Sequence, residues 1–402
     1  MNKNNTITGN IAMVAYTEYT TDPRVKRAAE SLAAAGYNID IYVLSETGRP
    51  RFEELKNVNV IRLKEIQYRG KSNLAYIASY LRFFFTLSAL FMTSDNRRKY
   101  KLIHIHNMPD FLVFTAIIPK LFGAKIILDI HDTMPELYKT KFRSILSNLA
   151  FLILLLEEKF SAWFADRVFA VHIPQKNFIV TNHKIPEDKI MVITNFADRD
   201  ILVPRKRDET ESKDGIFRLF YHGTIAKRFG LDIVLEGLKE VVKVHPAIKF
   251  SIYGKGDGER DLHSYIKLNG LQEIVSMHDS VPLEDIPSLA NNADLGIVCY
   301  RNTDEATQLM LPLKLMEYIS MEIPVLAVRN KAISYYFGEN DLEYYESDNS
   351  DSFAAKLILL IENPELLSKS VLKIKELNKK YNWETEKQKY LGVIRKMIND
   401  ES

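Results

Sequence analysis

The chain of 402 residues is too long for one ordinary hydrophobic core and fits two domains of about 200 residues each. Its 54 Lys and Arg residues nearly balance 52 Asp and Glu residues, so the net charge of +2 gives no global field for gathering nucleic acid. One cysteine, Cys299, excludes an internal disulfide, and its apolar neighbours predict a buried structural thiol. The first residues lack the apolar core of a signal peptide, so we expect a cytoplasmic protein.

Short apolar runs rich in Ile and Val alternate with helical patterns along the whole chain. Such alternation is typical of parallel sheets whose strands are joined by helices. The predicted strands of a first series are 11–16, 39–44, 102–106, 125–130 and 167–171. The predicted strands of a second series are 217–222, 249–253, 274–278, 294–300 and 324–328. The class is therefore α/β, with two doubly wound, Rossmann-like domains that face a cleft.

A charged segment separates the two series of strands. Residues 199–213 are rich in charge and poor in apolar side chains, so we expect them to form an interdomain linker. The first domain is then expected at residues 1–198 and the second at 214–383.

Ligands of open parallel sheets bind beyond the carboxyl ends of the strands, so the loops there are candidate sites. After the first strand, Asp22 and Pro23 suit the start of a helix, and Arg24 follows on its exposed side. Helix capping explains Asp22 as well as a ligand role does. Arg24 is the better candidate for contact with an acceptor.

Two further loops of the first domain carry histidines. Alternation along the strand at 102–106 sends His104 and His106 to one face and leaves Asn107 at the strand end. Such a pair of histidines is more often satisfied packing than a functional site. The next strand leads to His131, the strongest candidate in this domain, and Asp132 either orients His131 or caps the next turn.

In the second domain, the loop after the strand at 217–222 combines small residues with two cations. Gly223 permits close backbone approach, and Lys227 with Arg228 offers charge for a diphosphate, although an exposed basic loop is the alternative. Gly254 opens a glycine-rich turn without the Walker or dinucleotide spacing, so a tight turn explains it as well as nucleotide contact does.

The segment that begins at Leu311 is the most informative in the chain. Pro312 suits a first helical turn, and Lys314 and Glu317 lie one turn apart on one helix face. The free N–H groups of a helix start and the Lys314 ammonium attract phosphate, and the Glu317 carboxylate can accept hydrogen bonds from a ribose diol. The pattern favours a nucleotide diphosphate, with a plain amphipathic helix as the alternative.

This segment resembles the nucleotide-binding end of the family 4 retaining glycosyltransferases of GT-B type, roughly Pro-x-Lys-x-x-Glu-Tyr before Gly-x-Pro-Val. The resemblance covers nearly the whole chain and implies that the last helix, 384–402, packs back on the first domain. The chain departs from the family at Leu309, where a first Glu is common, and at Glu322, which replaces the Gly. It departs again at Thr224 and Phe229, where relatives often carry Arg and Lys.

The resemblance implies a hexosyl- or N-acetylhexosaminyltransferase that moves a sugar, with retention, from a nucleotide diphosphate donor, expected to be a UDP-sugar. The acceptor would be a saccharide or lipid-linked saccharide in the synthesis of cell-surface polysaccharide or glycolipid. We expect no metal or other cofactor and no nucleic-acid partner. The alternatives are a nucleotide-sugar epimerase and a degenerate nucleotide-binding subunit without catalysis.

The same resemblance assigns residues to roles. It places His131 and Glu317 in catalysis. The expected donor-binding residues are Gly223, Lys227, Arg228, Gly254, Lys314 and Glu317, and the expected acceptor-side residues are Arg24, His106, Asn107 and Asp132.

Two apolar segments raise the question of a membrane. Residues 74–92 are rich in aromatic side chains, contain one charge, Arg82, and precede a basic run at 97–101. They fit either a core helix or a helix that lies on the inner surface of an anionic membrane. Residues 145–156 are too short to span a bilayer and are expected to form a core helix over the first sheet.

Overall fold

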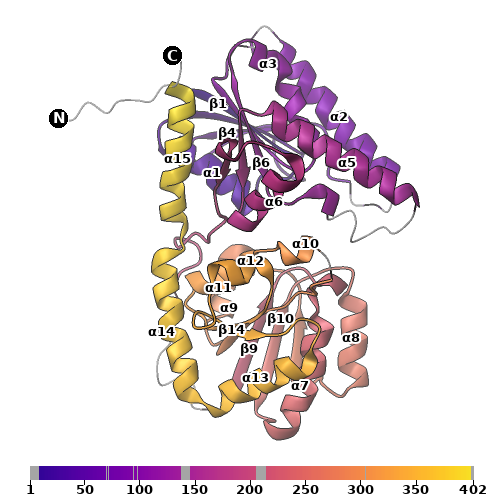
Figure 1. The fold of residues 1–402 in the computed structure, drawn as a ribbon, viewed down its shortest axis with the longest axis vertical. Helices are drawn as coiled ribbons and strands as arrows, with labels where there is room; N and C mark the ends of the chain where they lie inside the picture. Colours follow the sequence, from indigo (N-terminus) through magenta and orange to yellow (C-terminus); the bar gives the residue numbers. More distant parts are fainter. Residues whose placement is uncertain are drawn as a thin grey trace, which may run out of the picture. The chain divides into compact units, whose positions relative to one another are not determined.

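The computed structural model describes residues 9–68, 70, 72–93, 95–96, 98–136, 145–204, 214–303 and 305–399. The chain divides into two compact units, Met1–Thr194 with Lys387–Ser402, and Asn195–Glu386. Each unit is one sheet with helices on its faces (Figure 1). The predicted α/β class with two doubly wound sheets is confirmed.

The first unit holds a sheet of eight strands in the order β3-β4-β2-β1-β5-β6-β7-β8, parallel except for the antiparallel pair β3 and β4. The strands are β1 (Asn10–Ala15), β2 (Asn38–Val43), β3 (Phe52–Leu55), β4 (Val58–Arg62), β5 (Leu102–His106), β6 (Lys125–Ile130), β7 (Arg167–Ala170) and β8 (Ile190–Val192). The helices are α1 (Pro23–Ala34), α2 (Asn73–Met92), η1 (Asp110–Ala116), α3 (Ile117–Leu121), α5 (Ile145–Phe164), α6 (Ile173–His183), η2 (Glu187–Lys189) and most of α15 (Trp383–Asn399).

Alternation along β5 gives this sheet two different faces. Ile103 and Ile105 point into an apolar core that includes Phe83 and Leu87 of α2. The histidines of β5 point to the opposite face, where Tyr390 of α15 contacts His104. The apolar helices therefore cover one face, and the face with the histidines is closed by the end of the chain.

The second unit holds a parallel sheet of six strands in the order β11-β10-β9-β12-β13-β14. The strands are β9 (Phe217–His222), β10 (Ile248–Tyr253), β11 (Val275–His278), β12 (Leu295–Val298), β13 (Val325–Val328) and β14 (Glu343–Tyr345). The helices are η3 (Lys227–Phe229), α7 (Leu231–Val244), α8 (Glu259–Leu268), η4 (Leu283–Asp285), α9 (Ile286–Leu289), α10 (Glu305–Gln308), α11 (Leu313–Ser320), α12 (Lys331–Tyr336), α13 (Ser350–Glu362) and α14 (Pro364–Lys380).

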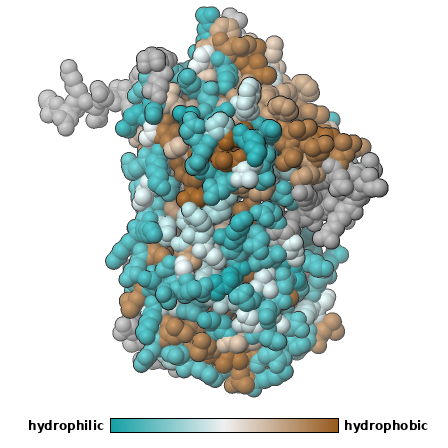
Figure 2. Space-filling view, viewed as in Figure 1, coloured by the Kyte–Doolittle hydropathy of each residue, from teal (hydrophilic) through white to brown (hydrophobic). Residues whose placement is uncertain are grey.

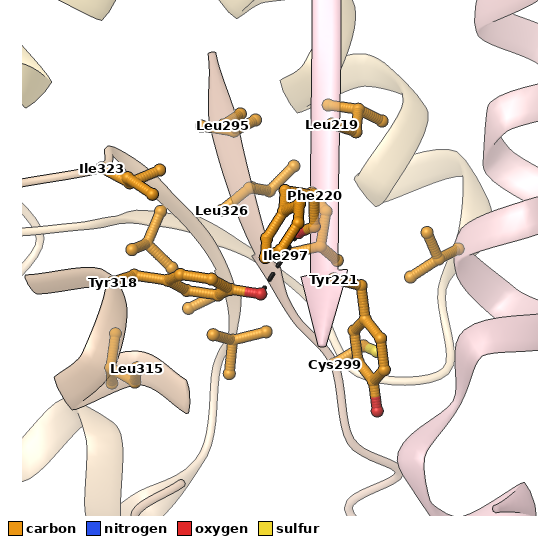
Figure 3. Packing of buried hydrophobic residues seen from close by; sticks show 14 of the residues in the cluster. Leu219, Phe220, Tyr221, Leu295, Ile297, Cys299, Leu315, Tyr318, Ile323 and Leu326 are labelled. Carbon is orange, nitrogen blue, oxygen red and sulfur yellow. Dashed lines mark hydrogen bonds between the residues drawn. The ribbon is translucent and has the colours of Figure 1, made fainter. Parts of the chain in front are cut away.

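Helix α11 is fixed on the second sheet by a buried tyrosine. The Tyr318 hydroxyl donates to the Phe220 carbonyl over 3.2 Å, and its ring covers Gly296, where a Cβ would lie 2.7 Å from a ring carbon (Figure 3). Cys299 lies beside Tyr221 at the end of this core and is fully buried, which confirms the predicted structural thiol. Burial raises the pKa of Cys299 to about 12.

The described part of the expected linker packs on the second unit. Leu202 is buried in its core, and its carbonyl accepts a hydrogen bond from the Ser320 hydroxyl over 2.7 Å. Arg199 donates to the Asn378 side chain over 2.8 Å. The remainder of the expected linker, 205–213, lies outside the described residues.

Candidate functional site

Lys314 lies in a cage of aromatic rings at the start of α11. The helix begins at Leu313, with Pro312 as its N-cap. Only 7% of Lys314 is exposed, and its ammonium lies 3.7 Å from the Tyr221 ring centroid and 5.3 Å from that of Phe229. Within the described residues, this ammonium forms no hydrogen bond or ion pair. It is a buried cation held by rings alone, which leaves its charge available to an anion.

Two glycine loops run past this cation. Gly223 has a φ of +120°, and a Cβ there would lie 3.3 Å from the Lys314 Nζ. A Cβ on Gly254 would lie 1.9 Å from the Gly223 carbonyl oxygen, so no side chain fits between the loops after β9 and β10. The structure thus brings Gly223, Gly254 and Lys314 together. Burial lowers the pKa of Lys314 to about 8, although Cys299 and Glu317 oppose the shift.

Glu317 faces a histidine that the sequence analysis did not select. The His222 Nε2, at the end of β9, lies 3.2 Å from the Glu317 Oε2. Burial, and then the charge of Lys314, lowers the pKa of His222 to about 3, so the imidazole is neutral at neutral pH. Glu317 therefore has a neutral, not a cationic, histidine beside it. Its position one turn after Lys314 suits acceptance of hydroxyl hydrogen bonds.

Lys227 and Arg228 lie on the short helix η3, which Arg301 fastens. The Arg301 Nε donates to the Lys227 carbonyl over 3.1 Å, and the Arg301 backbone N–H donates to the Arg228 carbonyl over 2.9 Å. Arg301 also forms ion pairs with Asp232 and Asp348. Lys227 is exposed, and the Arg228 Nε is buried without a hydrogen-bond partner in the described part of the chain. Arg301 is a further residue that the motif analysis missed.

The departures from the family pattern have local explanations. Glu322 has a φ of +57°, a left-handed conformation that glycine adopts more easily, and its carboxylate accepts a hydrogen bond from Asn378 over 3.2 Å. Leu309 is 6% exposed and packs as an apolar residue. Asp294 has a structural role, because its carboxylate accepts the Arg218 backbone N–H over 2.8 Å just before β12.

In the first unit, Arg24 and Asp22 form a bidentate ion pair, with Arg24 Nε to Asp22 Oδ1 at 3.1 Å and Nη2 to Oδ2 at 3.0 Å. Asp22 also caps α1 by accepting the Arg24 backbone N–H. Burial opposes the shift, yet Arg24, His131 and His106 hold the pKa of Asp22 below its usual range. Asp22 in turn, and then Asp132, raises the pKa of Arg24 against the effect of burial. These five residues share one electrostatic neighbourhood.

Asn107 holds the loop that carries His131. Its side-chain oxygen accepts the His131 backbone N–H over 2.8 Å, and its side-chain nitrogen donates to the Asp132 carbonyl over 2.7 Å. Its own backbone N–H donates to the Asp129 carbonyl over 2.9 Å. Both polar atoms of the Asn107 side chain are therefore hydrogen-bonded to this loop. A ligand would contact the loop that Asn107 positions, and not the Asn107 amide.

Asp129, absent from the motif analysis, is the centre of a buried histidine cluster. Its Oδ2 lies 3.2 Å from His104 Nε2, 3.2 Å from His106 Nδ1 and 3.6 Å from His131 Nε2. His106 Nδ1 is 3.1 Å from His131 Nε2, and His104 Nδ1 is 3.0 Å from the Tyr390 hydroxyl. The cluster forms a chain of hydrogen-bonding groups from α15 to His131.

In this cluster, His104, His131 and the carboxyl group of Asp129 have lowered pKa values. Burial lowers the pKa of His131 to about 3 and that of His104 to about 4. Burial opposes the shift at Asp129, but His131, His104 and His106 hold its pKa well below the usual range. The neutral imidazoles of His104 and His131 thus lie beside the Asp129 carboxylate. If the His106 Nδ1–H donates towards His131 Nε2, the proton of His131 is on Nδ1, an assignment made from the bonding pattern.

The same donors are the candidate metal ligands of the first unit. The ligand atoms of His104, His106 and Asp129 lie within 4.8 Å of one another. Each of these atoms already has a hydrogen-bonding partner in the cluster. Hydrogen bonds within the cluster therefore engage these candidate ligand atoms.

Comparison with known proteins agrees with this architecture. Residues 24–201 match the family "Glycosyltransferase Family 4", and residues 216–363 match "Glycosyl transferases group 1". The chain is 25% identical over 401 residues to a chitobiosyldiphosphodolichol beta-mannosyltransferase of Debaryomyces hansenii, a match that covers 90% of this chain and 83% of that protein.

Solved structures of low identity share the fold. Sucrose-phosphate synthase from Thermosynechococcus elongatus has a TM-score of 0.75 at 16% identity, over 97% of this chain and 99% of that one. HepE of Anabaena, solved with UDP and glucose, has a TM-score of 0.71 at 13% identity, over 96% of this chain and 99% of that one. The two family matches, which fall on the two units, and the two parallel sheets lead to one conclusion: the chain belongs to the family 4 glycosyltransferases of GT-B fold.

Proposed function

We propose that this glycosyltransferase binds a UDP-sugar on its second unit and transfers the sugar, with retention, to an acceptor hydroxyl. The observation that carries the proposal is Lys314, a buried ammonium beside the two glycine loops that has no ion-pair partner among the residues the structure describes. A diphosphate supplies the missing anion, and Lys227 and Arg228 supply further charge at the departing phosphates. Glu317, one turn after Lys314, receives the ribose hydroxyls.

In the first unit, His131 meets the sugar. A neutral imidazole can donate to a sugar hydroxyl or support developing charge without acting as a nucleophile. Arg24, His106 and Asp132 form the acceptor side, and Asn107 holds the loop. The acceptor is a saccharide or a lipid-linked saccharide, and transfer serves the synthesis of surface polysaccharide or glycolipid at the cytoplasmic face of a membrane.

The test separates the two units. Glu317→Ala should remove the thermal stabilisation that UDP gives, because the variant loses the ribose contacts. His131→Ala should keep this stabilisation and lose turnover. Release of UDP from a panel of UDP-sugars, with and without saccharide acceptors, gives the turnover. A Glu317→Ala variant with full UDP stabilisation would contradict the donor site.

The same assay addresses the alternatives. An epimerase would convert the donor sugar in the absence of any acceptor. A degenerate subunit would bind UDP but release none from any sugar donor, an outcome to which the apolar Leu309 at the place of a first Glu gives weight. Acceptor-dependent release of UDP contradicts both.

A further inference from the structure

The helix α5 shows its apolar side to the outside. Six large apolar side chains on it, at successive spacings of three, one, three, four and three residues, are 43–70% exposed: Leu149, Leu152, Ile153, Leu156, Phe160 and Trp163. Such spacings place them on one stripe of the helix. The carboxylate of Glu158 is instead fully buried. The expectation of a core helix at 145–156 is therefore wrong for the outward face, and the helix extends to Phe164.

The helices α2 and α3 continue this apolar surface. The exposed side chains of α2 are Leu74, Ile77, Leu81, Phe85 and Met92, and those at α3 are Ile117, Leu121 and Phe122. Helix α2 contacts α3, and both α2 and α5 contact η1, so the three helices belong to one layer. Figure 2 shows hydrophobic side chains gathered over this part of the first unit. We name it the α2–α3–α5 surface.

Helix α2 is long and apolar enough to cross a membrane, but its inner side belongs to the core. Only 17% of the segment Leu74–Met92 is buried, and this share includes Phe83, Leu87 and Phe91, each with no exposed surface. The Phe91 ring meets the Tyr42 ring edge-on at 5.4 Å. A helix with one side in the core and the other exposed can lie along a membrane without leaving its domain.

Cations lie at one end of this surface, next to its aromatic rings. The Arg98 guanidinium is 4.8 Å from the Phe122 ring centroid, and the Lys120 ammonium is 4.7 Å from that of Phe164. The Lys189 ammonium donates to the Trp163 carbonyl over 2.6 Å. Anions are interspersed here, since Asp166 pairs with Lys120 over 3.0 Å, and Glu187 and Asp188 precede Lys189 on η2. Lysine, arginine and tryptophan at the edge of an apolar surface are typical of contact with lipid head groups.

We propose that the α2–α3–α5 surface docks on an anionic lipid bilayer, with the apolar stripes at the level of the acyl chains and the cations at the phosphates. Helices α2 and α5 have 20 residues each, about 30 Å of length, which suits a broad, flat contact. The cationic edge favours anionic lipid over a second copy of the chain, whose matching edge would carry the same charge. The role of this docking rests on the proposed function, since an enzyme bound to the membrane surface would be close to a lipid-linked acceptor.

Vesicle binding tests this surface without donor or acceptor. The full chain should sediment with vesicles of phosphatidylglycerol and phosphatidylethanolamine, less with phosphatidylcholine, and less at high salt. Ile153→Glu and Phe85→Glu, on two different helices, should each lower the partition coefficient about tenfold or more. Leu268→Glu is the matched control, because Leu268 is 85% exposed on the second unit. An unchanged UDP-induced thermal shift shows that each variant is folded at its donor site.

Tryptophan fluorescence gives a readout on the unchanged protein. Of the two tryptophans, Trp163 is 70% exposed and Trp383 is 5% exposed, so a blue shift on adding anionic vesicles reports Trp163. Trp163→Phe should remove the shift. The proposal would be overturned if the wild-type protein sediments with neither the anionic nor the phosphatidylcholine vesicles, even if it binds UDP normally. It would also be overturned if the glutamate variants bind vesicles like the wild type. A dimer that Ile153→Glu dissociates, without vesicle binding, would assign the surface to a second copy.

Discussion

Replacement of Lys314 by methionine should make the unliganded second unit more stable while it loses the donor. Methionine has a similar length and no charge, so it can fill the same space among the Tyr221, Phe229 and Tyr300 rings. If replacing Lys314 stabilises the protein, the lysine is not there to stabilise the fold by packing. The variant therefore distinguishes a ligand role of Lys314 from a structural one.

The magnitude follows from the pKa of the lysine and from its rings. A pKa lowered from 10.5 to about 8 corresponds to about 3 kcal/mol of destabilisation at neutral pH, at about 1.4 kcal/mol per pH unit. Attraction between the ammonium and the rings offsets about 1–2 kcal/mol of this. Lys314→Met should therefore raise the free energy of unfolding by about 1–2 kcal/mol. For a unit of this size the melting temperature would rise by about 5 °C.

The pH dependence has a definite sign. The folded pKa lies below the unfolded one, so the unfolded chain binds more protons between pH 8 and 10.5. The stability contribution of Lys314 is unfavourable below pH 8, improves through this window and vanishes above it. Binding of UDP should weaken about tenfold per pH unit above pH 8, because the site loses its cation.

Thermal unfolding at pH 7 with and without saturating UDP measures both effects. UDP at a hundred times its dissociation constant should stabilise the wild type by about 2.7 kcal/mol and the Lys314→Met variant by much less. Lys243→Met is the control, since Lys243 is exposed on α7 and pairs with Glu240. A less stable Lys314→Met protein, or one that UDP stabilises like the wild type, would refute the reasoning.

Three further variants test the histidine cluster, a glycine loop and a helical glycine. Asp129→Asn should lower turnover about tenfold to a hundredfold and leave the UDP-induced thermal shift unchanged. Nitrogen NMR of the histidines should show a changed tautomer of His131. An unchanged NMR spectrum would contradict a role of Asp129 in positioning His131. Gly254→Ala should abolish UDP binding or unfold the second unit, because its Cβ would lie 1.9 Å from the Gly223 carbonyl. Gly392→Ala, a helical position with open space, should instead stabilise by about 0.5–1 kcal/mol in the same unfolding assay.

The strand and helix order could be predicted because apolar runs in parallel sheets are short, continuous and bounded by polar loops. The edge strands β3, β8 and β14, and β4 beside β3, escaped prediction because they are short or alternate with exposed residues. The positions of Lys314 and Glu317 on one helix face followed from helical spacing alone. The aromatic cage around Lys314 could not be predicted from spacing, because Tyr221, Phe229 and Tyr300 come from three separate places in the chain.

The histidine cluster shows where local spacing is insufficient. Alternation placed His104 and His106 on one face of β5, but their shared partner is on β6, where register pairs His106 with Asp129. The pairing of neighbouring strands, and the return of Tyr390 from a distance of 286 residues in sequence, are tertiary facts. The carboxylate that organises the cluster therefore became visible only when the strands were aligned.

Helix α5 is a second case in which local spacing is insufficient, because its polar side is buried and its apolar side is exposed. Periodicity shows which residues share a side of a helix, but it does not show which side faces inward. In α5 the inner side includes Glu158, whose carboxylate lies 2.5 Å from the His183 Nε2 and also accepts the Met134 backbone N–H. These partners make the polar side the buried one, and the leucine and aromatic stripe is left outside. A buried polar network on one side thus creates an apolar surface on the other, and that surface is the one we assign to lipid.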